Sequence, residues 1–256
     1  MSTTDAIFTP AFVEAQYRTY PSGTTAGEWQ SLPAGGGTFS LPISGTDGKW
    51  TVGYRAGNPC HTLNETDALT GGATQSIEVI LDTTAPVITI TKPATGSIFD
   101  TDDMSNIVYS VTDGALGSGV ATQPVTFDGA AATNGQLLDM FFLNPGVHTI
   151  VVSSTDKLGN ASSLTRTFEV HATSQSLGNN LNRAYSLGLI KKGVDNGLKA
   201  KTDAALKQHL SGKHSVEWNN LGALINLLEA QRGKGVDTAT ANRFIAWAQD
   251  LIALKR

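Results

Sequence analysis

The chain has 256 residues, of which 40% are hydrophobic and 16% are charged. This length suits two or three domains, and the apolar content excludes general disorder. The apolar runs fall short of the ~18 residues that a membrane-spanning helix needs, and the single cysteine, Cys60, excludes an intrachain disulfide.

The net charge of −4 is unevenly distributed along the chain. Residues 1–175 hold 6 Lys and Arg against 16 Asp and Glu, whereas residues 176–256 hold 12 against 6, so the two parts carry net charges of −10 and +6. This contrast predicts two kinds of structural unit. The Lys and Arg residues of the basic part are scattered among apolar positions, which favours a solvated helical face over a surface for nucleic acid or membrane.

Residues 1–84 contain three segments with the β-branched and aromatic composition of strands, at 13–23, 49–58 and 75–84. They align, in the same order, with segments of the following region at 120–129, 147–160 and 164–173. Such internal similarity predicts two stacked modules of one kind. About 12 residues precede the first segment, where the second copy has about 34, so we expect the first module to be abbreviated or divergent.

Residues 85–173 have an all-β pattern. Their apolar segments are short, partly alternating and bounded by Gly, Asp, Asn or Pro, as in the strands of a sandwich. The segments are PVITI, NIVYSVT, QPVTFDG, HTIVVSSTD and LTRTFEVHA. The region therefore has the length and pattern of one immunoglobulin-like β-sandwich.

From residue 174 onward the apolar period changes from two to ~3.6 residues. One apolar stripe contains Trp218, Leu221, Leu224 and Leu228. A second contains Phe244 and Trp247. Asp237 is a candidate helix N-cap and Gly233 a candidate C-cap. The pattern predicts a small antiparallel bundle of three or four helices, with Trp218 and Trp247 in its core.

The sequence thus predicts a mainly β chain with an α-helical C-terminal domain. We expect tandem Ig-like β-sandwiches at 1–84 and 85–173, followed by a three- or four-helix bundle at 174–256.

Particular motifs extend this interpretation. The sequences DTTAPVITI, SVTDGALGSGVAT and GVHTIVVSSTDKLGN, within about 82–171, resemble the bacterial immunoglobulin-like repeats of secreted hydrolases and surface adhesins. Residues of about 13–84 look like a divergent copy of the same repeat, whose segment KWTVGYRAGN lacks the acidic residue of the Asp-x-x-Gly-Asn turn. The C-terminal part resembles a helical module of exported bacterial enzymes named for a Phe-Ile-Met-Ala-His signature: it keeps Phe244 and Ile245, and departs from the signature at Ala246 and Trp247.

Acidic and amide side chains stand at predicted strand ends and turns, and this suggests a calcium site. Calcium takes 6–8 oxygen ligands, which two loops and a short linker could supply together. The alternative is ordinary turn chemistry, in which Asp and Asn bond their own backbone. In the linker 82–86, Pro86 fixes its own φ and restricts Ala85. The candidate ligands are Asp82, Asp100, Asp102, Asp103, Asp113, Asp156 and Asn160.

Aromatic residues concentrate in the first module. Exposed aromatic faces stack on sugar rings, so Trp29, with Tyr17 and Tyr20, is a candidate glycan-binding set. Trp29 is expected to be the most exposed of the three. The alternative for all three is cross-strand packing.

No catalytic pattern is found. Cys60 and His61 are adjacent, but a nucleophilic cysteine needs a base that faces it and a third orienting group. Ser118 does not precede a helix, so it is not a hydrolase nucleophile elbow. The five histidines form no H-x-H or HExxH pair, so a zinc site is not predicted, and His148 is interpreted as structural.

We therefore expect a non-catalytic accessory or spacer region of an exported bacterial hydrolase or adhesin, located outside the cell or at its surface. Its signal peptide would lie outside this chain, because the first residues lack a basic n-region and an apolar h-region. Its expected partners are the catalytic or adhesive domains that precede it, with no nucleic acid and no membrane span. Carbohydrate or cell-surface binding through the aromatics of the first module is the alternative, and calcium is the one candidate cofactor.

Overall fold

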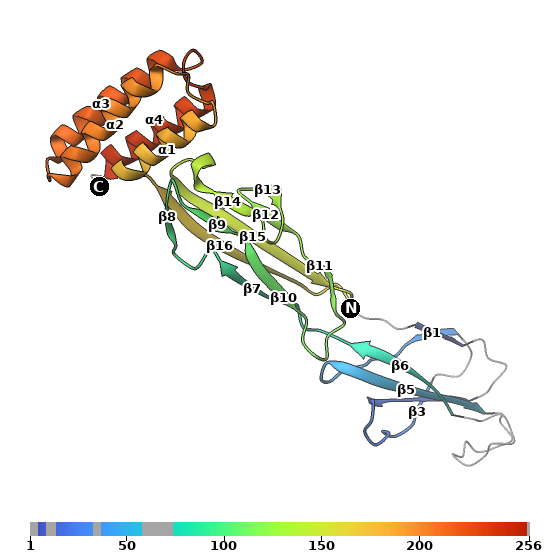
Figure 1. Ribbon diagram of the computed structural model, residues 1–256. Coiled ribbons are helices and arrows are strands. Elements are labelled where there is room, and N and C mark those ends of the chain that lie inside the picture. The colour runs from blue at the N-terminus through green and yellow to red at the C-terminus, as the bar shows by residue number, and fades with distance from the viewer. Residues whose placement is uncertain (1–4, 9–13, 33–36, 58–73, 255–256) are drawn as a thin grey trace. The chain divides into compact units, whose positions relative to one another are not determined.

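The computed structural model describes residues 5–8, 14–32, 37–57 and 74–254. More of these residues lie in strands than in helices, and four α-helices follow the strands in the sequence (Figure 1). This confirms the predicted fold class, mainly β with a C-terminal helical bundle. The chain divides into two compact units: unit 1 contains residues 1–88, 111–123 and 153–162, and unit 2 contains residues 89–110, 124–152 and 163–256.

Unit 1 contains a four-stranded antiparallel sheet in the order β3-β2-β5-β6. Apolar residues alternate along β5. Trp50 and Val52, two residues apart in this strand, point to the same face of the sheet and are both buried. Two further strands, β1 and β4, form an antiparallel pair. The strands are β1 (Asp5–Phe8), β2 (Glu14–Pro21), β3 (Gln30–Ser31), β4 (Gly37–Ser40), β5 (Gly48–Gly57) and β6 (Gln75–Leu81).

Later strands form a sheet in the order β13-β12-β15-β16-β8, in which β8 runs parallel to β16, and β11 also pairs with β15. Strands β14 and β9 form a second, antiparallel pair, and β10 pairs with β7. Strands β7, β10, β15 and β16 each contribute residues to both units. The bounds are β7 (Val87–Lys92), β8 (Ile98–Asp100), β9 (Met104–Asn106), β10 (Val108–Thr112), β11 (Val120–Thr122), β12 (Val125–Phe127), β13 (Ala130–Ala132), β14 (Leu137–Asp139), β15 (Gly146–Asp156) and β16 (Ala161–His171).

Strand β15 shows how the sequence positions its last residue. Every second residue from His148 to Asp156 is buried, with less buried residues between them, because side chains alternate between the two faces of a strand. Ile150 and Val152 belong to the apolar part of this row. The same alternation directs the carboxylate of Asp156 to the buried face at the end of the strand.

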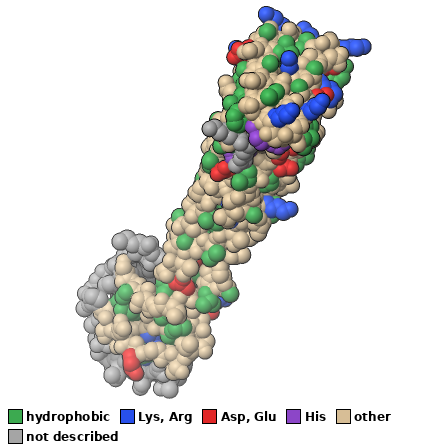
Figure 2. Space-filling model, turned by 90° about the vertical axis from the view of Figure 1, so that its left-hand side faces the viewer, with side chains coloured by type: hydrophobic (Ala, Val, Ile, Leu, Met, Phe, Trp, Pro, Cys, Tyr) green, Lys and Arg blue, Asp and Glu red, His purple; other side chains and the backbone are tan. Residues whose placement is uncertain are grey.

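The four helices, α1 (Ser174–Ser186), α2 (Val194–Leu210), α3 (His214–Gln231) and α4 (Thr238–Leu254), form the bundle in unit 2. Its core contains Leu221, Leu224, Leu228, Phe244 and Trp247, each fully buried, as the apolar stripes predict. Lys and Arg side chains gather over the helical part of the face shown in Figure 2, in agreement with the predicted basic, solvated surface.

The predicted N-cap of the last helix is confirmed, whereas the C-cap of α3 is Arg232, one position before the predicted Gly233. Asp237 precedes α4, and its carboxylate accepts hydrogen bonds from the backbone N–H and the hydroxyl of Thr240. Gly233 follows α3 with a φ of +71°, which a residue with a Cβ rarely adopts.

Helix α1 is bonded directly to strand-end residues of unit 2. Thr173 caps the helix and donates its hydroxyl to Asp100 at 2.7 Å. Thr101, Ser176 and Asn180 form a buried network, with 2.8 Å between the two hydroxyls and 3.0 Å from Asn180 Nδ2 to the Thr101 hydroxyl. The bundle therefore joins β16 without a flexible linker.

Candidate functional site

Three aspartates converge at the ends of three strands in unit 1. Asp82 follows β6, Asp113 follows β10, and Asp156 is the last residue of β15. One carboxylate oxygen from each lies within 4.8 Å of the others. Asp82 and Asp156 are buried and Asp113 is half-buried, so this set, with Asn160 beside it, is the strongest concentration of predicted ligands.

The carboxylate of Asp156 is surrounded by hydrogen-bond donors. Its Oδ1 accepts from the backbone N–H of Leu158 at 2.8 Å and of Asn160 at 2.9 Å, and its Oδ2 accepts from Asn160 Nδ2 at 2.6 Å. Burial alone raises the pKa of Asp156, but the bonds from Asn160 and Leu158 outweigh it and hold the pKa below its ordinary value. The bond to the amide two residues later is the turn chemistry of Asp.

Asp82 connects the strand end of β6 to two other segments. Its side chain accepts from the backbone N–H of Thr84 at 3.1 Å and of Ser118 at 2.6 Å. Its backbone carbonyl accepts from Asn160 Nδ2 at 3.0 Å. Asp113 similarly accepts from the backbone N–H of Gly119 at 2.5 Å. The three carboxylates therefore organise the turns that contain them.

Asp47, which the sequence analysis did not single out, also holds the segment after Asp82. Its carboxylate accepts from the backbone N–H of Thr83 at 3.0 Å and from the Thr83 hydroxyl at 2.9 Å, and it also accepts from the Thr84 hydroxyl. The hydroxyl of Thr84 and then that of Thr83 hold the pKa of Asp47 below its ordinary value. A lone aspartate before a strand gave no signal for this contact with residues 36 and 37 positions away.

We call residues 82–86 the connector. Its last residue, Pro86, accepts a hydrogen bond at its carbonyl from the hydroxyl of Ser162 at 2.5 Å. The connector is thus bonded to residues before β5, after β10 and after β15, all within unit 1. It is short in sequence and held at both ends.

The other predicted ligands lie elsewhere. Asp100, Asp102 and Asp103 belong to unit 2, at the end of β8 and in the turn that follows. Asp100 and Asp102 accept from Thr173 and Asn179, which cap or belong to α1, and Asp103 accepts from the backbone N–H of Asp100. These residues attach the helix and close a turn.

The donor set of Asp82, Asp113 and Asp156 has the hard oxygen chemistry that calcium takes. However, their carboxylates already accept N–H groups, and Asn160 presents its amide nitrogen to Asp82 and Asp156. Turn chemistry thus accounts for the observed bonds, and a bound calcium would have to exchange some of them. Calcium binding at these residues stays a prediction.

The predicted aromatic set does not form one platform. Trp29 is half-buried, and the guanidinium groups of Arg18 and Arg55 lie 4.3 and 4.1 Å from its ring centre. Tyr20 is also contacted by Arg18, 5.7 Å from its ring centre. Tyr17 is an odd-numbered residue of β2, whose side chains alternate, so it lies on the opposite face from Arg18 and Tyr20.

The remaining candidates have plain outcomes. His148 is 8% exposed and bonds Asp128 and the carbonyl of Asn144, which confirms its structural interpretation. Cys60 and His61 lie outside the described residues. No helix in the described ranges has the length and apolarity that a membrane span requires.

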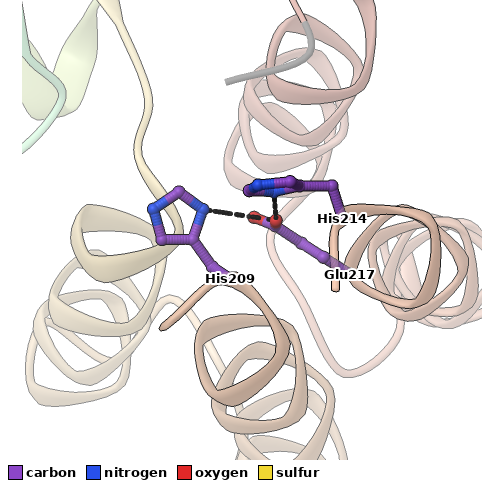
Figure 3. Close-up of side chains that lie close together, drawn as sticks. All are labelled: His209, His214 and Glu217. Atoms are coloured by element: carbon purple, nitrogen blue, oxygen red, sulfur yellow. Dashed lines mark hydrogen bonds and ion pairs between the residues drawn. The ribbon is translucent and has the colours of Figure 1, made fainter. Parts of the chain in front are cut away.

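A second group, His209, His214 and Glu217, was missed by the sequence analysis. One ligand atom from each lies within 4.8 Å of the others, and Figure 3 shows both imidazole rings directed at the carboxylate. The spacing crosses the turn between α2 and α3, so it matches none of the usual histidine pairs. The sequence did contain one signal for this group: one histidine falls in the last turn of a predicted helix, and another falls at the start of the next helix.

No family model matches the chain, and no curated protein matches it. Among solved structures, one of a 1.5-MDa bacterial ice-binding adhesin, concerning its retention at the host cell surface, has a TM-score of 0.29 and 15% identity, and covers 64% of this chain and 55% of that chain. The cis-dimer structure of protocadherin gammaB7 EC3-6 has a TM-score of 0.26 and 18% identity, and covers 67% of this chain and 43% of that chain. This chain therefore spans about half the length of the two solved chains.

Proposed function

We propose that the chain is a non-catalytic accessory region of an exported bacterial multidomain protein, in which it spaces and orients a functional unit that lies elsewhere in that protein. The observation that supports this most is the hydrogen-bonded connector. A spacer transmits orientation when its connections are short and their backbone groups are fixed, since each free residue adds conformational entropy.

The connector meets this condition through side chains from several segments. Asp47 bonds Thr83 and Thr84, Asp82 bonds Thr84, and Ser162 bonds Pro86. Pro86 also removes a rotatable φ and restricts the residue before it. Five residues with these constraints behave as a stiff joint, in contrast to a Gly- and Ser-rich linker.

The passage from β16 to α1 has the same character. Two residues separate the elements, Ala172, which is buried in the core of the bundle, and Thr173, which caps the helix. The bidentate ion pair of Arg183 with Asp139 adds a further tie between α1 and the end of β14. Both connections thus favour a scaffold over a flexible tether.

The spacer role is tested by distance distributions between spin labels. In a Cys60→Ser background, labels at Ser31 and Ala121, both exposed, both in unit 1 and on opposite sides of the connector in the sequence, are measured by double electron–electron resonance. A stiff joint predicts one narrow distribution, and Asp47→Ala, which removes the acceptor for two threonines, predicts a broader one.

Glu78→Ala is the matched control, because it removes an exposed carboxylate of the same unit that bonds Lys49 and not the connector. It should leave the distribution narrow. A broad distribution in the parent protein, or no broadening in Asp47→Ala, would contradict the proposed role.

A further inference from the structure

The group of His209, His214 and Glu217 joins three helices at one point of the bundle. His209 lies in the last turn of α2, and His214 and Glu217 lie in the first turn of α3. His209 Nδ1 is 3.1 and 3.2 Å from the two oxygens of Glu217, and His214 Nδ1 is 3.1 Å from Oε2 (Figure 3). Ser174, at the start of α1, donates its hydroxyl to Oε1 at 2.6 Å.

Glu217 is fully buried, whereas the side chains of His209 and His214 are 40% and 46% exposed. Burying a carboxylate is costly unless charge and hydrogen bonds compensate it. The ion-pair partners here are two imidazoles, which do not carry the obligatory charge of Lys or Arg. The N-terminal turn of α3 contributes a favourable partial charge, and a cation at this point would complete the compensation.

The donor set and its spacing fit a transition-metal ion. Two imidazole nitrogens and one carboxylate are a known set for zinc, which bonds N and O at ~2.0–2.2 Å in tetrahedral geometry, so its ligand atoms stand about 3.4 Å apart. The observed N to O distances of 3.1 to 3.2 Å are close to this value. Because both rings are exposed, they can rotate to close the remaining difference and leave a coordination position open to solvent.

The ligand chemistry also separates this group from the aspartates of unit 1. Imidazole suits zinc and its neighbours in the first transition row, whereas calcium takes oxygen ligands. Ser174 bonds the candidate carboxylate ligand from behind, as outer-shell partners do in metal sites.

We propose that His209 Nδ1, His214 Nδ1 and a carboxylate oxygen of Glu217 form a binding site for a divalent transition-metal ion of the zinc class. In the metal-free protein both Nδ1–H groups donate to Glu217. When the ion binds, each neutral ring carries its proton on Nε2, and the metal takes the place of the two hydrogen bonds. The ion then ties α2 to α3, and through Ser174 the site also contacts α1.

The test is calorimetric titration of the full chain with Zn²⁺, with bound metal counted by native mass spectrometry. The site predicts one Zn²⁺ per chain and no response to Ca²⁺ from these residues. His209→Gln and His214→Gln should each weaken binding by about 100-fold or more, since loss of an outer-shell partner alone costs roughly 10–100-fold. Ser174→Ala should weaken Zn²⁺ binding by that smaller factor, roughly 10–100-fold.

His61→Gln is the control, because it lowers the number of histidines equally and lies outside residues 174–254, which form the bundle. It should bind Zn²⁺ like the parent chain. Both tested imidazoles are substantially exposed, so their variants should keep the helical circular dichroism of the parent. Equal Zn²⁺ affinity in His209→Gln and the parent, or an equal loss in His61→Gln, would overturn the proposal, and neither result bears on the spacer role.

Discussion

Aspartates at strand ends do most of the organising in unit 1. A short carboxylate can reach the amide two residues later without leaving the backbone, and its second oxygen remains available for a distant donor. Asp82 uses both capacities, with Thr84 as the local donor and Ser118 as the distant one. The sequence could predict the local bond from residue type, but not the distant donor, which depends on how the strands pair.

Asp156 gives a direct test of this chemistry. Replacement by Asn keeps the shape but removes the charge and places an N–H₂ group where donors converge. We expect Asp156→Asn to lower the free energy of unfolding by about 2 kcal/mol at pH 7, measured by urea denaturation.

The pH dependence of Asp156 has a definite sign. Its pKa in the folded chain lies below the ordinary 3.8, so its contribution is fully present above that value and is lost as the pH falls through the folded pKa. The stability difference between the parent and Asp156→Asn should therefore shrink below pH ~3.8. A difference that grows on acidification would contradict the assignment.

The calcium prediction also belongs to these residues. An ion that binds only the folded chain must raise the melting temperature. At a free calcium concentration 100 times the dissociation constant, it adds about 2.7 kcal/mol to the free energy of unfolding. Thermal melts in EDTA and in millimolar calcium would show this shift, and Asp113→Asn should reduce it. Identical melting temperatures in EDTA and in calcium would refute the calcium prediction, and turn chemistry would then explain the positions of these carboxylates.

At the scale of elements, helices were the more predictable part. Apolar stripes with a period near 3.6, the cap at Asp237 and the glycine at 233 all depend on local sequence, and the structure has them. The position of Asp100 depends on the parallel pairing of β8 with β16, which brings the turn after β8 beside α1. No local pattern encodes that pairing, so Asp100, Asp102 and Asp103 were grouped with residues of another unit.

The cap of α4 can be tested alone. The carboxylate of Asp237 accepts hydrogen bonds from the backbone N–H and the hydroxyl of Thr240. Both bonds hold the pKa of Asp237 below its ordinary value, and the backbone bond has the larger effect. Asp237→Ala should therefore destabilise the bundle by about 1 kcal/mol at neutral pH, and the loss should fade as acid protonates the parent carboxylate. Asp203→Ala, which breaks an exposed pair with Lys199 inside α2, should cost less than about 0.5 kcal/mol; equal costs in denaturation would refute the cap.

At the scale of the whole molecule, composition and periodicity were sufficient for the fold class. Among the described residues, strands occupy the acidic part of the chain up to His171, and helices follow from Ser174 into the basic part. What the sequence could not supply is the set of side-chain contacts that the fold creates, such as Asp47 with Thr83, 36 positions away, or His209 with Glu217 across the turn between α2 and α3. These contacts carry the proposed stiffness and the proposed metal site.

The central claim is that side chains hold the connector fixed, and amide hydrogen exchange at Thr83 and Thr84 measures this most directly. Both N–H groups donate to carboxylates, so we predict slow exchange in the parent chain. In Asp47→Ala the Thr83 amide should exchange at least about tenfold faster, with amides of the α4 core unchanged. Exchange of Thr83 and Thr84 at the rate of an unstructured peptide in the parent chain would contradict the account.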